Sequence, residues 1–344
     1  MTRSDRSPHG GQPPSGTARI AVDLLGGDSA PAVVVDGALR ACSADPDLHL
    51  LLVGPRESAD EVLGALAVHD RERVSVSVVD RTVGMGDAPM RHVRRESTVR
   101  AAAEAVYAGR ADAMVSAGSS GAAVAASAHV LGRLPGVRRP GLAAHVPTPH
   151  GPVLLLDVGV TIDGTMLELV QHAVLGAAYA AAALGVADPR VGLLSVGSEP
   201  GKGDRLRRAV AVALSDTALP AGGRYIGLVE GHDVPLGGPA DVIVTDGFTG
   251  NILLKGIEGA TGRPLPSAEG ARPARGAALL GVAGTVVVCH GSADGPDIAS
   301  GIALAARLHR ERVIPAVAGL ADDLLTELSS AGGLTIRDAL GERS

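Results

Sequence analysis

Residues 19–29 read RIAVDLLGGDS, an apolar run that ends in an aspartate, two adjacent glycines and a second aspartate. Short uninterrupted runs of Val, Ile and Leu are typical of strands that are buried on both faces of a sheet. The pattern therefore predicts a strand followed by a polar loop. Similar runs, each stopping at a glycine-bearing loop, recur at 50–55, 113–121, 153–160, 191–199, 225–231, 242–250 and 286–292.

Alanine-rich stretches of helical character separate these predicted strands. Strands that alternate with helices indicate a doubly wound, mostly parallel α/β sheet with helices on both faces. In such sheets ligands bind beyond the carboxyl ends of the strands, where this sequence concentrates Gly, Asp, Ser and Asn. The predicted helices cover residues 32–44, 58–68, 97–108, 122–134, 167–184, 205–215, 297–309 and 321–330.

The composition argues against several classes of protein. Of the 344 residues, 46% are hydrophobic, but with no Trp, one Phe and three Tyr the core must be aliphatic. A net charge of −6 and 1% aromatic residues argue against a nucleic-acid binder, which needs a basic face and stacking side chains. Cys42 and Cys289 lie far apart, and the histidines lack metal-ligand spacing. We therefore expect no disulfide framework, no metal, and a reducing, cytoplasmic location.

We expect a single α/β domain over residues 18–330, long enough to divide into two closely joined lobes. Residues 1–17 are polar and rich in Pro, Gly and Ser, which predicts a disordered tail and not a secretory signal. Residues 261–275 (TGRPLPSAEGARPAR) predict a short Pro-rich connector, and 331–344 a C-terminal tail. The apolar stretch 173–187 is too short to span a bilayer.

Two strand-end loops have the composition of an anion-binding site. Residues 23–28 (DLLGGD) and 116–121 (SAGSSG) place glycines and hydroxyls just before a predicted helix. Backbone N–H groups in such loops can turn toward an anion, and the helix N-terminus adds partial positive charge. A tight turn whose aspartate only caps the helix fits residues 23–28 equally well. The second loop does not match the G-x-S-x-G pattern of serine hydrolases.

Two later loops add side chains that fit an anionic substrate. Residues 197–204 (GSEPGKGD) lack the P-loop spacing and its Mg²⁺-binding Ser or Thr, so Lys202 either contacts substrate or is a solvated loop lysine. Residues 246–251 (DGFTGN) combine an acid, a hydroxyl and an amide, although Asn251 alone also fits a helix N-cap. His290 follows the last strand, where a lone histidine is more often structural than catalytic.

Taken in order, these segments resemble the bacterial phosphate acyltransferases, the acyl carrier protein:phosphate transacylases of phospholipid synthesis. The resemblance runs from about residue 19 to 307 and rests on IAVDLLGGDSAP, SAGSSGA, LGRLPGVRRPGLA, LLLDVG, PRVGLLSVG with KG, ADVIVTDGFTGN and HGS. It implies a fold related to phosphotransacetylases and isocitrate-type dehydrogenases, a homodimer, and no metal or nucleotide cofactor. It also implies that inorganic phosphate attacks the thioester of an acyl carrier protein. The acyl phosphate would then pass to a membrane-bound glycerol-3-phosphate acyltransferase.

This chemistry asks little of the protein, because phosphate is a competent nucleophile and a thiol is a fair leaving group. The protein needs only to align them and to stabilise the developing oxyanion. We expect Lys202 and Asn251 to act at the reacting centre, where Asp246 and Thr249 would position them. The expected substrate-binding residues are Asp23, Gly26, Gly27, Asp28, Gly118, Ser119, Ser120, Gly121, Asp163, Thr249 and His290.

The chain departs from the family pattern at three places. It has Ser119-Ser120 where the family has Asn-Thr, and 160–163 (VTID) where the family has Ala-Asn followed by an acid. The Pro-rich stretch 261–275 stands where the family has two amphipathic helices that touch the membrane. This last departure favours an alternative, a relative that acts on a shorter or unusual acyl chain. A catalytically silent dimer that binds carrier protein is a second alternative. A dehydrogenase fits less well, because no G-x-G-x-x-G follows a strand.

Overall fold

The computed structural model describes residues 16–84, 95–261 and 276–330. Strands in this part of the chain form one sheet in the order β3-β2-β1-β4-β11-β10-β5-β6-β9-β7-β8. The strands are β1 (Ala18–Asp23), β2 (Leu48–Gly54), β3 (Val74–Val78), β4 (Ala113–Ser116), β5 (Gly141–Val146), β6 (Val153–Leu156), β7 (Arg190–Leu194), β8 (Arg224–Val229), β9 (Val242–Val244), β10 (Gly276–Leu280) and β11 (Thr285–Cys289).

The sheet consists of two parallel halves joined by antiparallel strands. Strands β3, β2, β1, β4 and β11 are parallel, and we call them the β1 half. Strands β6, β9, β7 and β8 are also parallel, and we call them the β7 half. Between the halves, β10 runs antiparallel to β11 and β5, and β5 antiparallel to β6. The predicted mostly parallel sheet is confirmed, whereas the sequence did not predict β3, β5 or β10.

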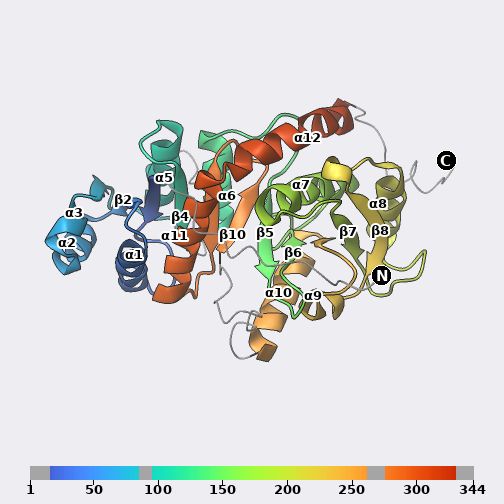
Figure 1. The fold of residues 1–344 in the computed structure, drawn as a ribbon, viewed down its shortest axis with the longest axis horizontal. Coiled ribbons are helices and arrows are strands. Elements are labelled where there is room, and N and C mark those ends of the chain that lie inside the picture. The colour runs from blue at the N-terminus through green and yellow to red at the C-terminus, as the bar shows by residue number, and fades with distance from the viewer. Residues whose placement is uncertain (1–15, 85–94, 262–275, 331–344) are drawn as a thin grey trace.

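Helices cover both faces of the sheet, as a doubly wound fold requires (Figure 1). Apolar side chains of α1, α2, α7, α8, α11 and α12 share one buried cluster, and those of α5, α6, α9 and α10 pack in the other. The helices are α1 (Ala32–Ala44), α2 (Arg56–Ala65), α3 (Val68–Arg71), α5 (Thr98–Tyr107), α6 (Ser120–Val130), α7 (Met166–Leu184), α8 (Arg205–Asp216), α9 (Asp233–Leu236), α10 (Gly247–Thr261), α11 (Gly295–Arg310) and α12 (Val313–Ser330), with a 3₁₀ turn at Pro220–Gly222.

Two helix starts show why one predicted boundary was right and another was wrong. Helix α7 begins at Met166, within one residue of the prediction, because Thr165 and Glu168 form a capping box, and it ends at Leu184, before the C-cap Gly185, whose φ is 63°. Helix α12 begins at Val313, well before the predicted residue 321. Pro315 falls in its first turn, where a missing N–H leaves no helical hydrogen bond unmade.

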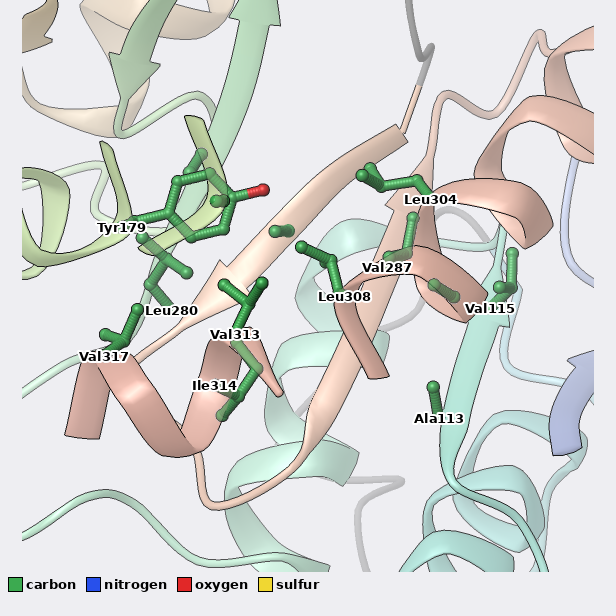
Figure 2. Close-up of a cluster of buried hydrophobic side chains, with 14 of the residues drawn as sticks. Ala113, Val115, Tyr179, Leu280, Val287, Leu304, Leu308, Val313, Ile314 and Val317 are labelled. Atoms are coloured by element: carbon green, nitrogen blue, oxygen red, sulfur yellow. The ribbon is translucent and has the colours of Figure 1, made fainter. Parts of the chain in front are cut away.

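Both buried clusters contain strand residues from the two halves, and one of them also contains α11, α12 and α7. Figure 2 shows Val287 of β11 between Leu308 of α11 and Val115 of β4, and Tyr179 of α7 beside Leu280 of β10. From here α12 runs across to α7, so it bridges the halves (Figure 1). Helix α7 is long and apolar enough to cross a membrane, but 78% of its apolar stretch is buried inside the protein. It is therefore a core helix of this fold.

Candidate functional site

Three strand-end loops of the β1 half meet at neighbouring strands. The loops follow β1, β4 and β11, which lie side by side in the sheet. Ser116 Oγ donates a hydrogen bond to Asp23 Oδ2 at 2.7 Å, and the Asp28 N–H donates to the Gly291 carbonyl at 2.8 Å. We call residues 26–28, 118–121 and 290–292 the glycine-loop cluster. The predicted residues of the β1 and β4 loops are therefore brought together.

The backbone approach in this cluster is too close for larger residues. A Cβ on Gly26 would lie 2.7 Å from the Gly118 nitrogen and 2.9 Å from the Ala117 nitrogen. Gly27 has φ of +116°, in the left-handed region that side chains disfavour. The two adjacent glycines thus let the β1 loop lie directly against the β4 loop.

The helix that follows each loop begins without using the predicted side chains as caps. Helix α1 has Pro31 at its N-cap, so Asp28 does not cap it, and its carboxylate is exposed. Helix α6 has Ser119 at its N-cap, but that side chain makes no capping hydrogen bond. His290 is exposed, and its Nδ1 lies 2.8 Å from Ser292 Oγ. The side chains of Asp28, Ser119 and His290 therefore lie at the glycine-loop cluster, and none of them caps α1 or α6.

In the β7 half, a buried carboxylate organises the loop after β6. Asp157 is fully buried, and its two oxygens accept hydrogen bonds from the N–H groups of Leu142, Gly159, Val160 and Thr161 and from the Thr161 hydroxyl, at 2.6 to 3.2 Å. The sequence prediction did not include Asp157. Its signal was present, since an acid directly follows a buried apolar strand in LLLDVG.

The first turn of α10 packs directly on this loop. A Cβ on Gly250 would overlap the Asp157 carbonyl oxygen, and one on Gly247 would lie 2.7 Å from the Thr161 nitrogen. Asn251 Nδ2 donates to the Val158 carbonyl at 2.9 Å. Asn251 is inside α10 and so is not its N-cap. The amide thereby ties α10 to the β6 loop.

The Asp246 carboxylate accepts three hydrogen bonds. Its oxygens accept from the Thr249 N–H at 2.9 Å, from the Thr249 hydroxyl at 2.8 Å and from the Arg207 guanidinium. Arg207 also bonds Asp204 Oδ2 at 2.9 Å, and its side chain is only 12% exposed. The sequence prediction missed Arg207, because RLRR at the start of α8 resembles an ordinary solvated helix face. We call Asp157, Arg207, Asp246, Thr249 and Asn251 the α10 cluster.

Lys202 and Asp163 lie at the surface, in the loops that follow β7 and β6. The Lys202 side chain is about half exposed and its Nζ lies 3.9 Å from Glu199 Oε2. Asp163 is exposed in the β6 loop, next to Gly164, whose Cβ would approach the Asp246 Cβ to 3.3 Å. The structure therefore brings Asp246, Thr249 and Asn251 together. A joint action of Lys202 with Asn251 stays a prediction.

The fold of this chain is that of the phosphotransacetylases. A phosphotransacetylase from Streptococcus pyogenes superposes with a TM-score of 0.60 at 17% identity, covering 87% of this chain and 94% of that one. The EutD phosphotransacetylase from Staphylococcus aureus gives 0.57 at 16% identity, covering 86% and 96%.

Sequence comparison narrows this class to one family. Residues 18–263 match the family model described as "Fatty acid synthesis protein". Proteins named phosphate acyltransferase from Bacillus thuringiensis (strain Al Hakam) and Bacillus mycoides (strain KBAB4) are each 37% identical over 332 residues, covering 88% of this chain and 98% of theirs. The chain belongs to the phosphate acyltransferase family.

Proposed function

We propose that this chain converts acyl-[acyl carrier protein] and inorganic phosphate into acyl phosphate for phospholipid synthesis. A phosphate oxygen attacks the thioester carbonyl carbon, the carbon–sulfur bond breaks, and the proton of hydrogen phosphate ends on the carrier thiol. No oxidant, reductant or enzyme-bound acyl group is needed. The catalytic task is to align two anionic partners and to stabilise the oxyanion.

The observation that carries the proposal is the convergence of the β1, β4 and β11 loops at adjacent strand ends. Backbone N–H groups at the start of α6 and in a glycine turn suit a phosphate anion. The Ser119 and Ser120 hydroxyls lie at the start of α6, where the Ser119 side chain makes no capping hydrogen bond, and Asp28 does not cap α1. We therefore assign phosphate to the glycine-loop cluster, with His290 at its edge.

The α10 cluster is suited to the thioester carbonyl. Asn251 carries an amide at the start of α10, and Lys202 supplies a cation on the neighbouring loop. Asp246 already accepts three donors, so we assign it and Thr249 to holding the α10 turn and not to proton transfer. Asp163 would contact the substrate at the exposed rim. A homodimer, a cytoplasmic location and delivery to a membrane glycerol-3-phosphate acyltransferase complete the proposal.

The test is to incubate purified protein with phosphate and a panel of acyl carrier proteins that differ in acyl length, and to trap acyl phosphate with hydroxylamine. We expect acyl hydroxamate that depends on both phosphate and enzyme. A maximum at short acyl groups would identify the alternative substrate class. Carrier binding with no acyl phosphate from any chain length would instead support the silent dimer.

Two alanine variants test which residues act at the reacting centre. We expect Lys202→Ala and Asn251→Ala each to lower kcat by about 100-fold or more, because each removes a group that stabilises the oxyanion. Lys255→Ala is the matched control, since Lys255 is an exposed lysine on α10. If folded Lys202→Ala and Asn251→Ala proteins match the control, the assignment is wrong.

A further inference from the structure

We infer that Asp23 and Ser116 form a positioning pair that sets the separation of the β1 and β4 loops around bound phosphate. Asp23 was expected to contact substrate, whereas Ser116 had no expected role. Both side chains are almost completely buried, at 2% and 1% exposure. The inference rests on the proposed function, because it takes phosphate as the ligand of the glycine-loop cluster.

The pair lies at the point where the strand order reverses direction. The chain builds β2 and β3 on one side of β1 and then crosses to β4 on the other, so β1 and β4 flank the switch point of this half. Ligands of open α/β sheets bind at such points. The register pairs Val22 with Val115, so Asp23 and Ser116 are the next residues on adjacent strands. Their 2.7 Å hydrogen bond joins the ends of β1 and β4 at the point where the two loops begin.

Each member of the pair also holds the first turn of its own loop. Asp23 Oδ1 accepts from the Leu25 N–H at 3.2 Å, just before the two glycines. Ser116 Oγ accepts from the Gly118 N–H at 3.1 Å, just before Ser119 and the start of α6. Moving either side chain would therefore move the backbone donors assigned to phosphate.

Strand pairing alone does not call for this contact. The β1–β4 ladder is already formed by residues 20–22 and 113–115. A buried carboxylate is a costly way to join two strands, and burial here raises the pKa of Asp23 against the opposing hydrogen bonds. A buried polar pair of this kind gives a defined separation that apolar packing does not, and a displacement of about 1 Å can cost about 100-fold in rate.

The test compares Ser116→Ala, Asp23→Asn and the double variant with Ser127→Ala. Ser127 is a matched control, because it is fully buried in α6, two turns beyond Ser119, and its Oγ contacts Met114 Sδ at 3.8 Å. Phosphate binding is measured by calorimetry, and KM for phosphate and kcat by acyl phosphate formation. Ser116→Thr, which keeps the hydroxyl, is the conservative rescue.

We expect Ser116→Ala and Asp23→Asn each to raise the phosphate Kd and KM by about 10- to 100-fold, with a smaller change in kcat. The double variant should be no worse than the weaker-binding single variant, and Ser116→Thr should recover part of the loss. Ser127→Ala should lower the Tm without changing the phosphate Kd.

Phosphate binding at the wild-type level in folded Ser116→Ala and Asp23→Asn proteins would overturn the inference. Wild-type protein that binds phosphate, but forms no acyl phosphate, would overturn the proposed function, and calorimetry of the variants would then decide the pairing on its own. Wild-type protein that neither binds phosphate nor forms acyl phosphate would overturn both.

Discussion

Aspartates that end buried strands do the same work at three places in this protein. Asp23, Asp157 and Asp246 lie at or just beyond the ends of β1, β6 and β9. Asp23 and Asp157 accept backbone N–H groups of the loops that follow them, and Asp246 accepts the Thr249 N–H in the first turn of α10. A buried carboxylate is tolerated only where donors replace the lost water. At the residue scale, then, the strand-end acids shape the chain that follows them, and we propose that the exposed Lys202, Asp163 and His290 contact the substrate.

The Arg207–Asp246 pair should stabilise the α10 turn. Arg207→Met would leave the Asp246 carboxylate with only its Thr249 donors, which should lower the free energy of unfolding by about 1–3 kcal/mol. With Asp246→Asn added, the double variant should lose less than the sum, by about 1 kcal/mol or more. Denaturant titration measures all three. Arg208→Met, at an exposed neighbouring arginine, is the control and should change the free energy of unfolding by about 0.5 kcal/mol or less. If the losses of Arg207→Met and Asp246→Asn simply add in the double variant, the two side chains do not stabilise each other.

His145 should make the protein sensitive to acid. Burial, assisted by the positive charge of Arg307, lowers the pKa of His145 from 6.5 to about 4. The unfolded chain binds a proton at this site below pH 6.5 while the folded protein does not, so stability should fall from pH 6.5 toward 4. The loss is at most about 3 kcal/mol.

Denaturant titration across this pH range checks the effect of His145. His145→Gln, which cannot titrate, should show a shallower pH dependence. His69→Gln, which replaces a histidine whose side chain is 82% exposed, is the surface control. Equal slopes for all three proteins would show that His145 is not the acid-sensitive group.

At the scale of elements, the position of α10 decides whether Asn251 faces the β6 loop. The helix starts against backbone, and only glycine fits at 247 and 250. Further along the same helix, Gly256 and Gly259 adjoin open space, because a Cβ on either residue would have no atom within 4 Å outside its own helix backbone. The first turn of α10 is therefore closely packed against the β6 loop, whereas space remains beside Gly256 and Gly259.

This contrast gives a prediction within one helix. Gly250→Ala should push α10 away from Asp157, lowering the free energy of unfolding by about 1–3 kcal/mol and reducing acyl phosphate formation. Gly256→Ala should stabilise by about 0.5–1 kcal/mol, because alanine favours a helix where space is open. Thermal unfolding and the hydroxamate assay measure both. Equal stability of the two variants would contradict the close packing.

Much of this element arrangement could be predicted from the sequence, for identifiable reasons. Apolar runs that stop at a glycine-bearing loop locate β1, β4, β6, β9 and β11, because burial on both faces leaves no polar alternation. Strands β5 and β10 escape detection because GLAAHV and GAALL are alanine-rich and lack an uninterrupted run of Val, Ile or Leu of strand length. Their antiparallel pairing depends on contacts far apart in the chain. The same holds for Ser116 and Arg207, whose partners Asp23 and Asp246 lie 93 and 39 residues away.

At the scale of the whole molecule, one core holds the two candidate clusters on a common frame. The strands of the β1 half and the β7 half are separated by β10 and β5, but α11, α12 and α7 share the apolar cluster of Figure 2. Packed interiors resist deformation, so this cluster transmits strain between the halves. The spacing of the glycine-loop and α10 clusters therefore depends on residues remote from both.

Leu308 tests that connection. It is fully buried where α11 meets the sheet and α12, so Leu308→Ala should lower the free energy of unfolding by about 2–5 kcal/mol through the cavity it leaves. Leu320→Ala removes the same atoms from a side chain of α12 that is 41% exposed, and should cost much less. Chemical denaturation of the two variants side by side is sufficient, and similar losses would argue against a shared core at Leu308.

The central claim, that phosphate itself attacks the thioester, is tested most directly by the stoichiometry of a single reaction. Purified protein is mixed with acyl carrier protein thioester and phosphate, and free carrier thiol and acyl phosphate are measured in the same sample. We predict that the two products appear in equal amounts and that neither forms without phosphate. Thiol release without acyl phosphate, or thiol release that does not depend on phosphate, would contradict the account.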